Sequence, residues 1–233
     1  ESPVKEAMNE ELKQFQQYNV YTEMENTGQV TISTRWVVTE KTVNNGKDKI
    51  TKARLVCRGF EEITNEPLDS PTVSKVSLRL VFCIMMNKGW KCESLDIKGA
   101  FLQSDPLEHD VFIKAPNAVG KVWKLLKPLY GLKYASRKWF VSVKKLLLEK
   151  GCEQSKIDKC VFLYYVGSEL CGLLVTHVDD FLACGNQDFQ EVIINAIKQT
   201  FMISKHVHQL FSYVGLEVEQ TQQKVLISQR QYL

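Results

Sequence analysis

The sequence lacks the long hydrophobic run and the paired cysteines that mark membrane-spanning and disulfide-bonded proteins. No apolar segment approaches the roughly 20 residues that a membrane-spanning helix requires. The seven cysteines are odd in number and scattered, none in a Cys-x-x-Cys pair, and most lie inside apolar runs. This pattern favours buried thiols in a reducing compartment over zinc ligands or disulfides.

Several common catalytic motifs are missing as well. The chain has no Gly-x-Ser-x-Gly elbow, no glycine-rich phosphate loop ending in Lys-Ser/Thr and no His-Glu-x-x-His motif. What it has is an ordinary globular composition, with 44% hydrophobic and 24% charged residues. A length of 233 residues suits one large domain or two modest ones.

The net charge of +3 hides two strongly basic segments. Residues 121–150 carry nine Lys/Arg against one acidic residue, and residues 35–60 carry seven against two, so the local balances are +8 and +5. The rest of the chain is therefore negative. Concentrated basic segments on an otherwise acidic chain indicate a surface for a polyanion, with ordinary solvated charge as the alternative.

Apolar spacing predicts the helix and strand order of an α+β protein. Helices are expected at residues 3–18, 74–88 and 137–150, and after Asp188, which with Glu191 has the spacing of a capping box. The second of these helices is apolar nearly all round and is expected to be buried. Strands are expected at residues 30–38, 49–58, 90–97, 111–113, 122–125, 161–166, 170–177, 213–219 and 224–228.

The first two strands are predicted to form a basic hairpin. Asn44-Asn45-Gly46 between them is a strong turn signal. In the second strand, the two-residue period places Lys52, Arg54 and Arg58 on one face.

The segment Leu173–Ala183 carries the most distinctive residues, since two apolar runs flank the adjacent Asp179 and Asp180. Neighbouring carboxylates at the tip of a buried hairpin repel each other unless a cation neutralises them. A solvated turn is the more common fate of such a pair, and it remains the alternative for this segment taken alone. Asp96 ends another apolar strand and can converge on the same point.

Three carboxylates suit Mg²⁺, which prefers hard oxygen ligands. Two such ions about 3.5–4 Å apart would stabilise the attacking and leaving oxygens of a phosphoryl displacement. Together with the basic segments, this arrangement predicts nucleotidyl transfer. His206 and His208 would share one face of a strand and could bind a metal, although two solvated or partly packed histidines are the favoured interpretation.

Five motifs, in order along the chain, resemble the reverse transcriptase domain of the Ty1/copia class of LTR retrotransposon polyproteins. They are Lys52-Ala53-Arg54-Leu55-Val56-Cys57-Arg58-Gly59-Phe60, Leu95-Asp96-Ile97-Lys98-Gly99-Ala100-Phe101-Leu102, Leu129-Tyr130-Gly131-Leu132-Lys133 with Arg137 and Trp139, His177-Val178-Asp179-Asp180, and Tyr213-Val214-Gly215-Leu216-Glu217. Ser228-Gln229 with Tyr232 resembles a segment that soon follows in the family. Each motif is weak alone, and the ordered set is specific.

The resemblance implies a right-hand polymerase fold with fingers, a palm and the start of a thumb, in which an antiparallel palm sheet packs on helices. Residues 1–89 would hold the N-terminal helix and the fingers hairpin leading into the palm. Residues 90–210 would hold the palm with an interspersed fingers segment, and residues 211–233 the primer-grip hairpin and the start of the thumb. The implied enzyme is an RNA-directed DNA polymerase that uses two Mg²⁺ ions, with Mn²⁺ as the alternative ion.

The resemblance also implies the catalytic residues. Asp96 and Asp179 would hold both metal ions with help from the Ile97 carbonyl, and Asp180 would be a weaker ligand or a support. Phe101 would lie beneath the incoming sugar and reject a 2′-hydroxyl, with a core aromatic as the alternative.

Further implied roles concern the nucleotide and the duplex. Tyr130 and the basic row would bind the nucleotide, although which basic side chain meets the triphosphate is open, and Gly131 would let the backbone approach the templating base pair. Contacts with nucleic acid are expected from Lys133, Arg137, Lys138, Lys144, Lys145, His177, Tyr213 and Gly215, some of these basic residues being merely solvated.

The sequence departs from the family pattern at two places. His177 stands where the family has tyrosine, and Tyr134-Ala135-Ser136 stands where it has Gln-Ala-Pro. Neither change removes a metal ligand, but both leave open a decayed or domesticated remnant that binds nucleic acid without polymerising. A palm-type nucleotide cyclase is the least favoured alternative.

Partners and location follow from the resemblance alone. The implied partners are an RNA or DNA template–primer duplex, dNTPs, and the integrase and RNase H regions of a polyprotein, with no membrane partner. The implied location is the cytoplasm, within virus-like particles, with entry into the nucleus.

Overall fold

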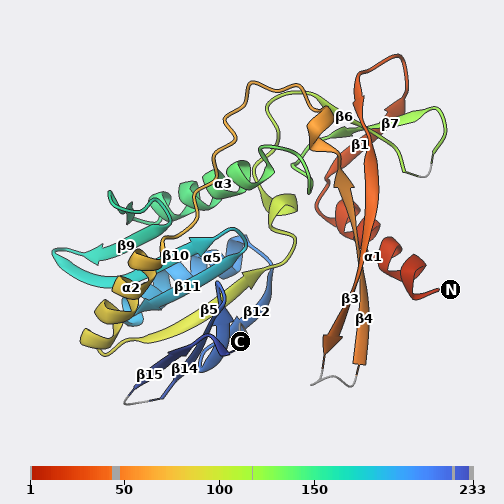
Figure 1. The fold of residues 1–233 in the computed structure, drawn as a ribbon. Helices are drawn as coiled ribbons and strands as arrows, with labels where there is room; N and C mark the ends of the chain where they lie inside the picture. The colour runs from red at the N-terminus through yellow and green to blue at the C-terminus, as the bar shows by residue number, and fades with distance from the viewer. Residues whose placement is uncertain (1, 44–47, 117, 222–223, 231–233) are drawn as a thin grey trace. The chain divides into compact units, whose positions relative to one another are not determined.

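The computed structural model describes residues 2–43, 48–116, 118–221 and 224–230 (Figure 1). The chain divides into two compact units, Glu1–Asp69 with Phe101–Trp139, and Ser70–Ala100 with Phe140–Leu233. Each unit combines helix with sheet around its own hydrophobic core, so the predicted α+β class is confirmed. The assignment of fingers, palm and thumb to residue ranges stays a prediction.

The first unit opens with helix α1, whose cap residue Ser2 accepts a hydrogen bond from the backbone N–H of Lys5. A long antiparallel hairpin of β3 and β4 follows. Its predicted turn, Asn44-Asn45-Gly46, lies outside the described residues. The other strands form a four-stranded sheet in the order β1-β7-β6-β2. The bounds in this unit are α1 Pro3–Gln17, β1 Tyr21–Glu25, β2 Thr31–Ile32, β3 Thr34–Val43, β4 Asp48–Cys57, η1 Gly59–Glu61, β6 Val111–Lys114 and β7 Lys121–Leu125.

The second unit is built on a six-stranded antiparallel sheet in the order β12-β5-β11-β10-β9-β8. Helix α2 and the small sheet β13-β14-β15 share a hydrophobic core with one face, while Phe140 of α3 and Phe189 of α4 contact the other. The strand bounds are β5 Lys91–Ile97, β8 Cys152–Gln154, β9 Val161–Val166, β10 Glu169–His177, β11 Asp180–Gly185, β12 Ile203–Val207, β13 Leu210–Tyr213, β14 Leu216–Gln220 and β15 Val225–Ser228.

The remaining helical segments belong to the second unit or contain residues of both units. Their bounds are α2 Lys75–Asn87, η2 Ala100–Gln103, α3 Ala135–Glu149, α4 Gln187–Phe189, η3 Gln190–Ile194 and α5 Asn195–Thr200. Among the described residues, no helix is both long enough and apolar enough to cross a membrane.

Helix α2 begins after Ser74 as predicted, but it is not buried all round. Val76 and Leu80 are 74% and 54% exposed, whereas Leu78 and Phe82 are buried. A helix that lies on one face of a sheet buries only the stripe directed at that sheet. The apolar composition of α2 therefore led to an overestimate of its burial.

Two other local predictions are corrected. The residue that caps α4 is Asn186, whose side-chain oxygen accepts a hydrogen bond from the Phe189 N–H at 3.2 Å, and it is not Asp188. The strand predicted at residues 213–219 is interrupted at Val214 and Gly215, both of which have positive φ. Two such residues make a tight hairpin turn, which periodicity alone did not resolve.

Candidate active site

Asp96, Asp179 and Asp180 lie at one end of the six-stranded sheet. Because β11 pairs with both neighbours, Asp180 lies opposite His177 on β10 and opposite Asp96 on β5. Asp179 lies in the loop between β10 and β11, and its carbonyl oxygen accepts a hydrogen bond from the Ile97 N–H at 3.0 Å. The structure therefore brings together the two acidic motifs that the sequence predicted to converge.

The loop that carries Asp179 is strained. Val178 has φ of +55°, a conformation that β-branched side chains rarely adopt. Such strain costs on the order of 1–3 kcal/mol and persists only where the surrounding structure enforces it. The strands on either side provide that support, since Val175 and Phe181 are fully buried. The loop therefore presents its aspartate from a rigid base.

Asp96 has a polar neighbour from the edge strand. The Ser204 hydroxyl donates to the Asp96 carboxylate and also lies 3.1 Å from the Asp96 carbonyl oxygen. Ser204 reaches this position at an irregularity in the pairing of β12 with β5. Asp96, Asp179 and Asp180 are all partly exposed. Carboxylate oxygens are the ligands that a hard divalent cation prefers.

The predicted nucleic-acid contacts of the same unit differ in exposure. His177 is half-buried, and its Nδ1 atom has no hydrogen-bond partner among the described residues. Gly215 lies exposed in the β13–β14 turn. Tyr213 is only 1% exposed, and its hydroxyl donates to the Val175 carbonyl oxygen at 3.2 Å. Tyr213 therefore supports the hairpin from the core, and its predicted direct contact with nucleic acid is withdrawn.

In the first unit, β4 presents the predicted basic row. Lys52, Arg54 and Arg58 are exposed, and the residues between them alternate inward as the strand period requires. The Arg54 guanidinium lies 5.1 Å from the centre of the Tyr130 ring, a cation–π arrangement. The Phe101 and Tyr130 rings are 4.9 Å apart between centroids. Two predicted nucleotide-binding aromatics and one basic side chain thus form one cluster.

Gly131 has a structural reason to be glycine that the sequence did not reveal. A Cβ at this position would collide with the Cys57 carbonyl oxygen and approach Val56 Cγ1 to 2.7 Å. Its φ of +90° also disfavours other residues. Close packing on β4 is completed by a hydrogen bond of 2.8 Å from the Cys57 N–H to the Tyr130 carbonyl oxygen. The predicted approach of Gly131 to a base pair stays a prediction.

The five basic residues expected along α3 and its approach are not equally available. Lys145 is exposed and Lys144 is half-buried. Lys133 contacts the Glu62 carbonyl oxygen at 2.8 Å, Arg137 contacts Asp69 at 2.6 Å and Lys138 contacts Glu108 at 3.3 Å. Part of the predicted basic surface is therefore neutralised by the protein itself.

Two polar residues, one on β12 and one on β5, were not singled out from the sequence. Ser204 carried no signal, because its contact depends on the irregular pairing of β12. Glu93 could have been found from the sequence, because it is an acidic residue inside an apolar strand. It is 2% exposed.

Comparison with known proteins gives a consistent result. A family model described as "Reverse transcriptase (RNA-dependent DNA polymerase)" matches residues 18–233. The Pol polyprotein from transposon RE1 of Arabidopsis thaliana is 31% identical over 87% of this chain and 14% of the relative. The Pol polyprotein from transposon TNT 1-94 of Nicotiana tabacum is 28% identical over 97% of this chain and 18% of the relative. The chain therefore spans a small part of these curated relatives.

Solved structures with similar folds include two kinds of polymerase. A prototype foamy virus protease–reverse transcriptase matches with a TM-score of 0.54 at 12% identity, over 94% of this chain and 26% of that one. Telomerase from Candida albicans matches with a TM-score of 0.52 at 9% identity, over 95% of this chain and 50% of that one. At such low identity the likeness concerns the fold alone, and it confirms the predicted polymerase fold.

Proposed function

This chain belongs to the reverse transcriptase (RNA-dependent DNA polymerase) family as a Ty1/copia-type domain, and we propose that it catalyses RNA-directed DNA synthesis. The observation that carries the proposal is the position of Asp180 opposite Asp96, with Asp179 in the adjoining loop. Partly exposed carboxylates at the end of a paired sheet are suited to nucleotidyl transfer and poorly suited to a purely structural role.

The donor set fits the divalent metal ions that the family uses. All the available ligand atoms are oxygens, and a hydroxyl from Ser204 fixes one carboxylate. We assign Asp96 and Asp179 as the principal ligands of two Mg²⁺ ions, with the Ile97 carbonyl as a further ligand and Asp180 as a support. When bound, such ions would stabilise the oxygens that attack and leave during the phosphoryl displacement.

The basic row of β4 would bind the incoming nucleotide. Lys52, Arg54 and Arg58 offer positive charge to the triphosphate, and the contact with Tyr130 restrains the Arg54 guanidinium. Phe101, packed against the same ring, would exclude a 2′-hydroxyl by steric contact. These assignments would make the enzyme selective for deoxynucleotides.

The template–primer duplex would be bound through phosphate contacts and the hairpin turns. We assign phosphate contacts to Lys144, which is half-buried, and to Lys145, which is exposed, and a primer-end contact to His177. A foamy virus reverse transcriptase of similar fold has been solved with an RNA/DNA hybrid, with a TM-score of 0.52. We propose the same class of partner here, together with the other regions of a Pol polyprotein in a cytoplasmic virus-like particle.

Primer extension tests this function. The Pol polyprotein that carries this domain should extend a DNA primer on an RNA template with dNTPs and Mg²⁺, and Asp179→Asn should abolish extension. The contrary result is a folded protein that binds the hybrid in a salt-sensitive manner without incorporating dNTPs. That result would favour a non-polymerising remnant, which the replacement of tyrosine by His177 in the family motif makes the second candidate.

A further inference from the structure

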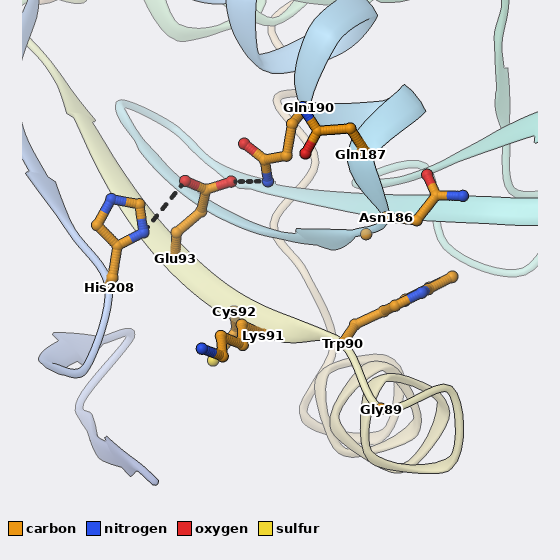
Figure 2. Close-up of a pocket in the computed structure, with 10 residues that line it drawn as sticks. Gly89, Trp90, Lys91, Cys92, Glu93, Asn186, Gln187, Gln190 and His208 are labelled. Atoms are coloured by element: carbon orange, nitrogen blue, oxygen red, sulfur yellow. Dashed lines mark hydrogen bonds and ion pairs between the residues drawn. The ribbon is translucent and has the colours of Figure 1, made fainter. Parts of the chain in front are cut away.

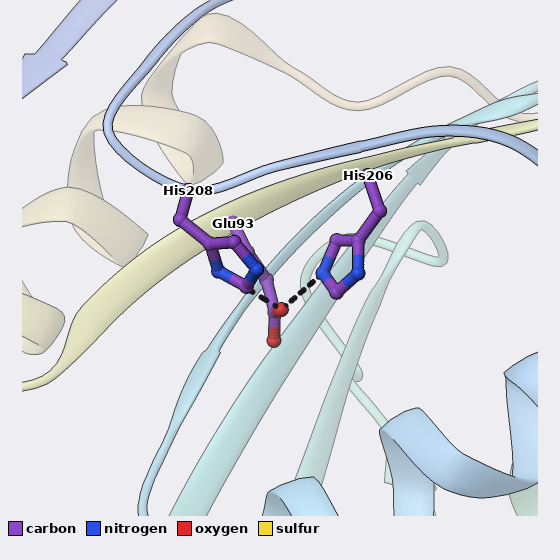
Figure 3. Close-up of side chains that lie close together, drawn as sticks. All are labelled: Glu93, His206 and His208. Carbon is purple, nitrogen blue, oxygen red and sulfur yellow. Dashed lines mark hydrogen bonds and ion pairs between the residues drawn. The ribbon is translucent and has the colours of Figure 1, made fainter.

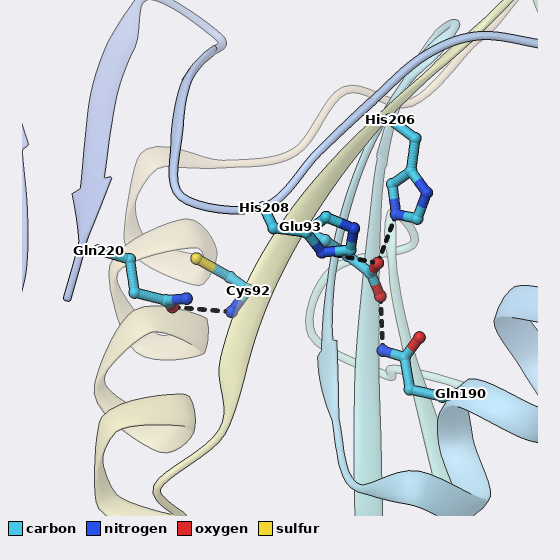
Figure 4. Close-up of polar contacts among 6 residues, drawn as sticks. All are labelled: Cys92, Glu93, Gln190, His206, His208 and Gln220. Atoms are coloured by element: carbon cyan, nitrogen blue, oxygen red, sulfur yellow. Dashed lines mark hydrogen bonds and ion pairs between the residues drawn. The ribbon is translucent and has the colours of Figure 1, made fainter. Parts of the chain in front are cut away.

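Glu93 is a buried carboxylate that the proposed polymerase chemistry does not use. It lies on β5 and is 2% exposed, although glutamate is almost never fully buried without partners. Its Oε1 atom accepts a hydrogen bond from Gln190 Nε2 at 2.5 Å. Its Oε2 atom lies 2.5 Å from His206 Nε2 and 3.5 Å from His208 Nδ1 (Figure 4).

Strand pairing explains why the two histidines reach this carboxylate. In the antiparallel pairing of β12 with β5, His206 lies opposite Leu95, so His208 continues toward Glu93. Side chains two residues apart on a strand point to the same face. Both imidazoles therefore converge on Glu93, as Figure 3 shows, on the sheet face opposite to Asp96.

The three ligand atoms are spaced closely enough for one ion. They all lie within 4.8 Å of one another. Tetrahedral coordination with bonds of about 2.0–2.1 Å would separate the ligand atoms by about 3.3 Å. The His208–Glu93 distance of 3.5 Å already meets this requirement, and the His206–Glu93 distance of 2.5 Å must open by less than about 1 Å. Both rings can adjust, because His206 is 21% and His208 62% exposed.

We propose that Glu93, His206 and His208 form a second metal site that takes a divalent transition-metal ion of the Zn²⁺ type. Two imidazole nitrogens and one carboxylate oxygen are a ligand set that zinc accepts, whereas Mg²⁺ prefers oxygen alone. Glu93 and His208 also line a cavity of about 440 Å³, from which water can complete the coordination (Figure 2). Gln190, on the second carboxylate oxygen, orients the ligand.

The ion would fasten the edge strand β12 to β5. This connection matters to the acidic cluster, because Ser204 lies on β12 two residues before His206 and contacts Asp96. The site is therefore a positioning device for that edge of the sheet. The competing interpretation is a carboxylate that shares protons with two histidines and binds no metal.

Calorimetric titration of the full chain with Zn²⁺, after chelation and in excess Mg²⁺, separates the two interpretations. Cys83→Ser serves as the background, because Cys83 is the one exposed thiol of the seven. We expect one Zn²⁺ per chain, and a loss of at least about tenfold in affinity for His206→Ala/His208→Ala, since each removed ligand costs a metal–ligand bond. His109→Ala is the matched control, because His109 pairs with Glu66 elsewhere and should bind zinc unchanged.

Two further readouts keep the test decisive. Gln190→Leu should weaken Zn²⁺ binding by roughly 10–100-fold without removing a ligand. If the double variant does not fold, His208→Ala alone replaces it, since that ring is largely exposed. Zinc binding that is equal in the ligand variants and in the control, or absent from the folded parent chain, would overturn the proposal.

Discussion

Strand β5 carries one carboxylate on each face, and the two have opposite surroundings. Asp96 is partly exposed beside Asp180 and receives one hydroxyl from Ser204. Glu93 is buried, with the Gln190 amide donating to one oxygen and the His206 imidazole 2.5 Å from the other. Asp96 therefore lies beside another carboxylate, whereas Glu93 is held by an amide and an imidazole of the protein.

This difference predicts that Asp96 matters for catalysis and Glu93 for stability, although both lie on β5. Removing Asp96 relieves repulsion and deletes a metal ligand, so the fold should tolerate the change while activity disappears. Removing Glu93 leaves buried donors without an acceptor, so the fold should lose stability first. The residue type alone does not predict whether activity or stability is lost, because the neighbouring side chains determine it.

The largest expected effect is that of Asp96→Asn on DNA synthesis. Metal-assisted charge stabilisation contributes several kcal/mol, so the rate of primer extension should fall by about 10³-fold or more. The thermal midpoint should change little. Asp188→Asn, an exposed aspartate of the same unit, is the matched control. The prediction would be contradicted if Asp96→Asn unfolded the protein while the fraction that remains folded kept its activity.

Glu93→Ala should act on stability. The Gln190 amide would lose its acceptor and the His206 imidazole its partner, and leaving a buried polar group unsatisfied costs about 1–3 kcal/mol. Urea denaturation should show a lower midpoint with an unchanged slope. Glu153→Ala on β8 is exposed and should change the midpoint little. Equal midpoints for the two variants would contradict the buried role of Glu93.

Glu11 in α1 adds a third environment to the comparison. It is a buried carboxylate with few hydrogen-bond donors around it. It is 7% exposed and accepts a hydrogen bond from the Leu55 N–H at 3.3 Å. Burial raises the pKa of Glu11 from 4.5 to about 7, against the opposing effects of that N–H and Arg54. The folded state then binds this proton more tightly than the unfolded state does.

Stability contributed by Glu11 should therefore be complete below pH 4.5 and be lost as the pH rises to about 7. The loss amounts to about 3 kcal/mol, and Glu11→Gln should abolish it and stabilise the protein at pH 8. Denaturation curves of the variant and its parent between pH 4.5 and 8 measure the effect. Parallel pH profiles would show that Glu11 does not titrate in this range.

The smallest effect expected at the active site is that of Ser204→Ala. A hydrogen bond to a charged group contributes about 1.5 kcal/mol, so kcat should fall roughly tenfold with KM for dNTP unchanged. Ser204→Thr should restore the rate, and Ser212→Ala, at an exposed position of β13, should leave it unaltered. A change in KM alone would assign Ser204 to substrate binding and not to the orientation of Asp96.

The sequence revealed those features that short motifs encode and missed those that depend on pairing. Asp96, Asp179 and Asp180 were identified because each follows an apolar strand in a motif with a recognisable order. Ser204 and the contact of His206 with Glu93 were not, because they arise from the irregular register between β12 and β5. Strand β1 was missed for another reason, since most of its residues are exposed and show no apolar alternation.

One measurement tests the division of roles along β5 most directly. Primer extension in Mg²⁺ is compared for Asp96→Asn and Glu93→Gln in the same polyprotein, at a temperature where circular dichroism shows both folded. Asp96→Asn should lose about 10³-fold in rate, and Glu93→Gln should stay within about tenfold of the parent. Equal losses, or a larger loss for Glu93→Gln, would contradict the assignment of the catalytic charge to the Asp96 face.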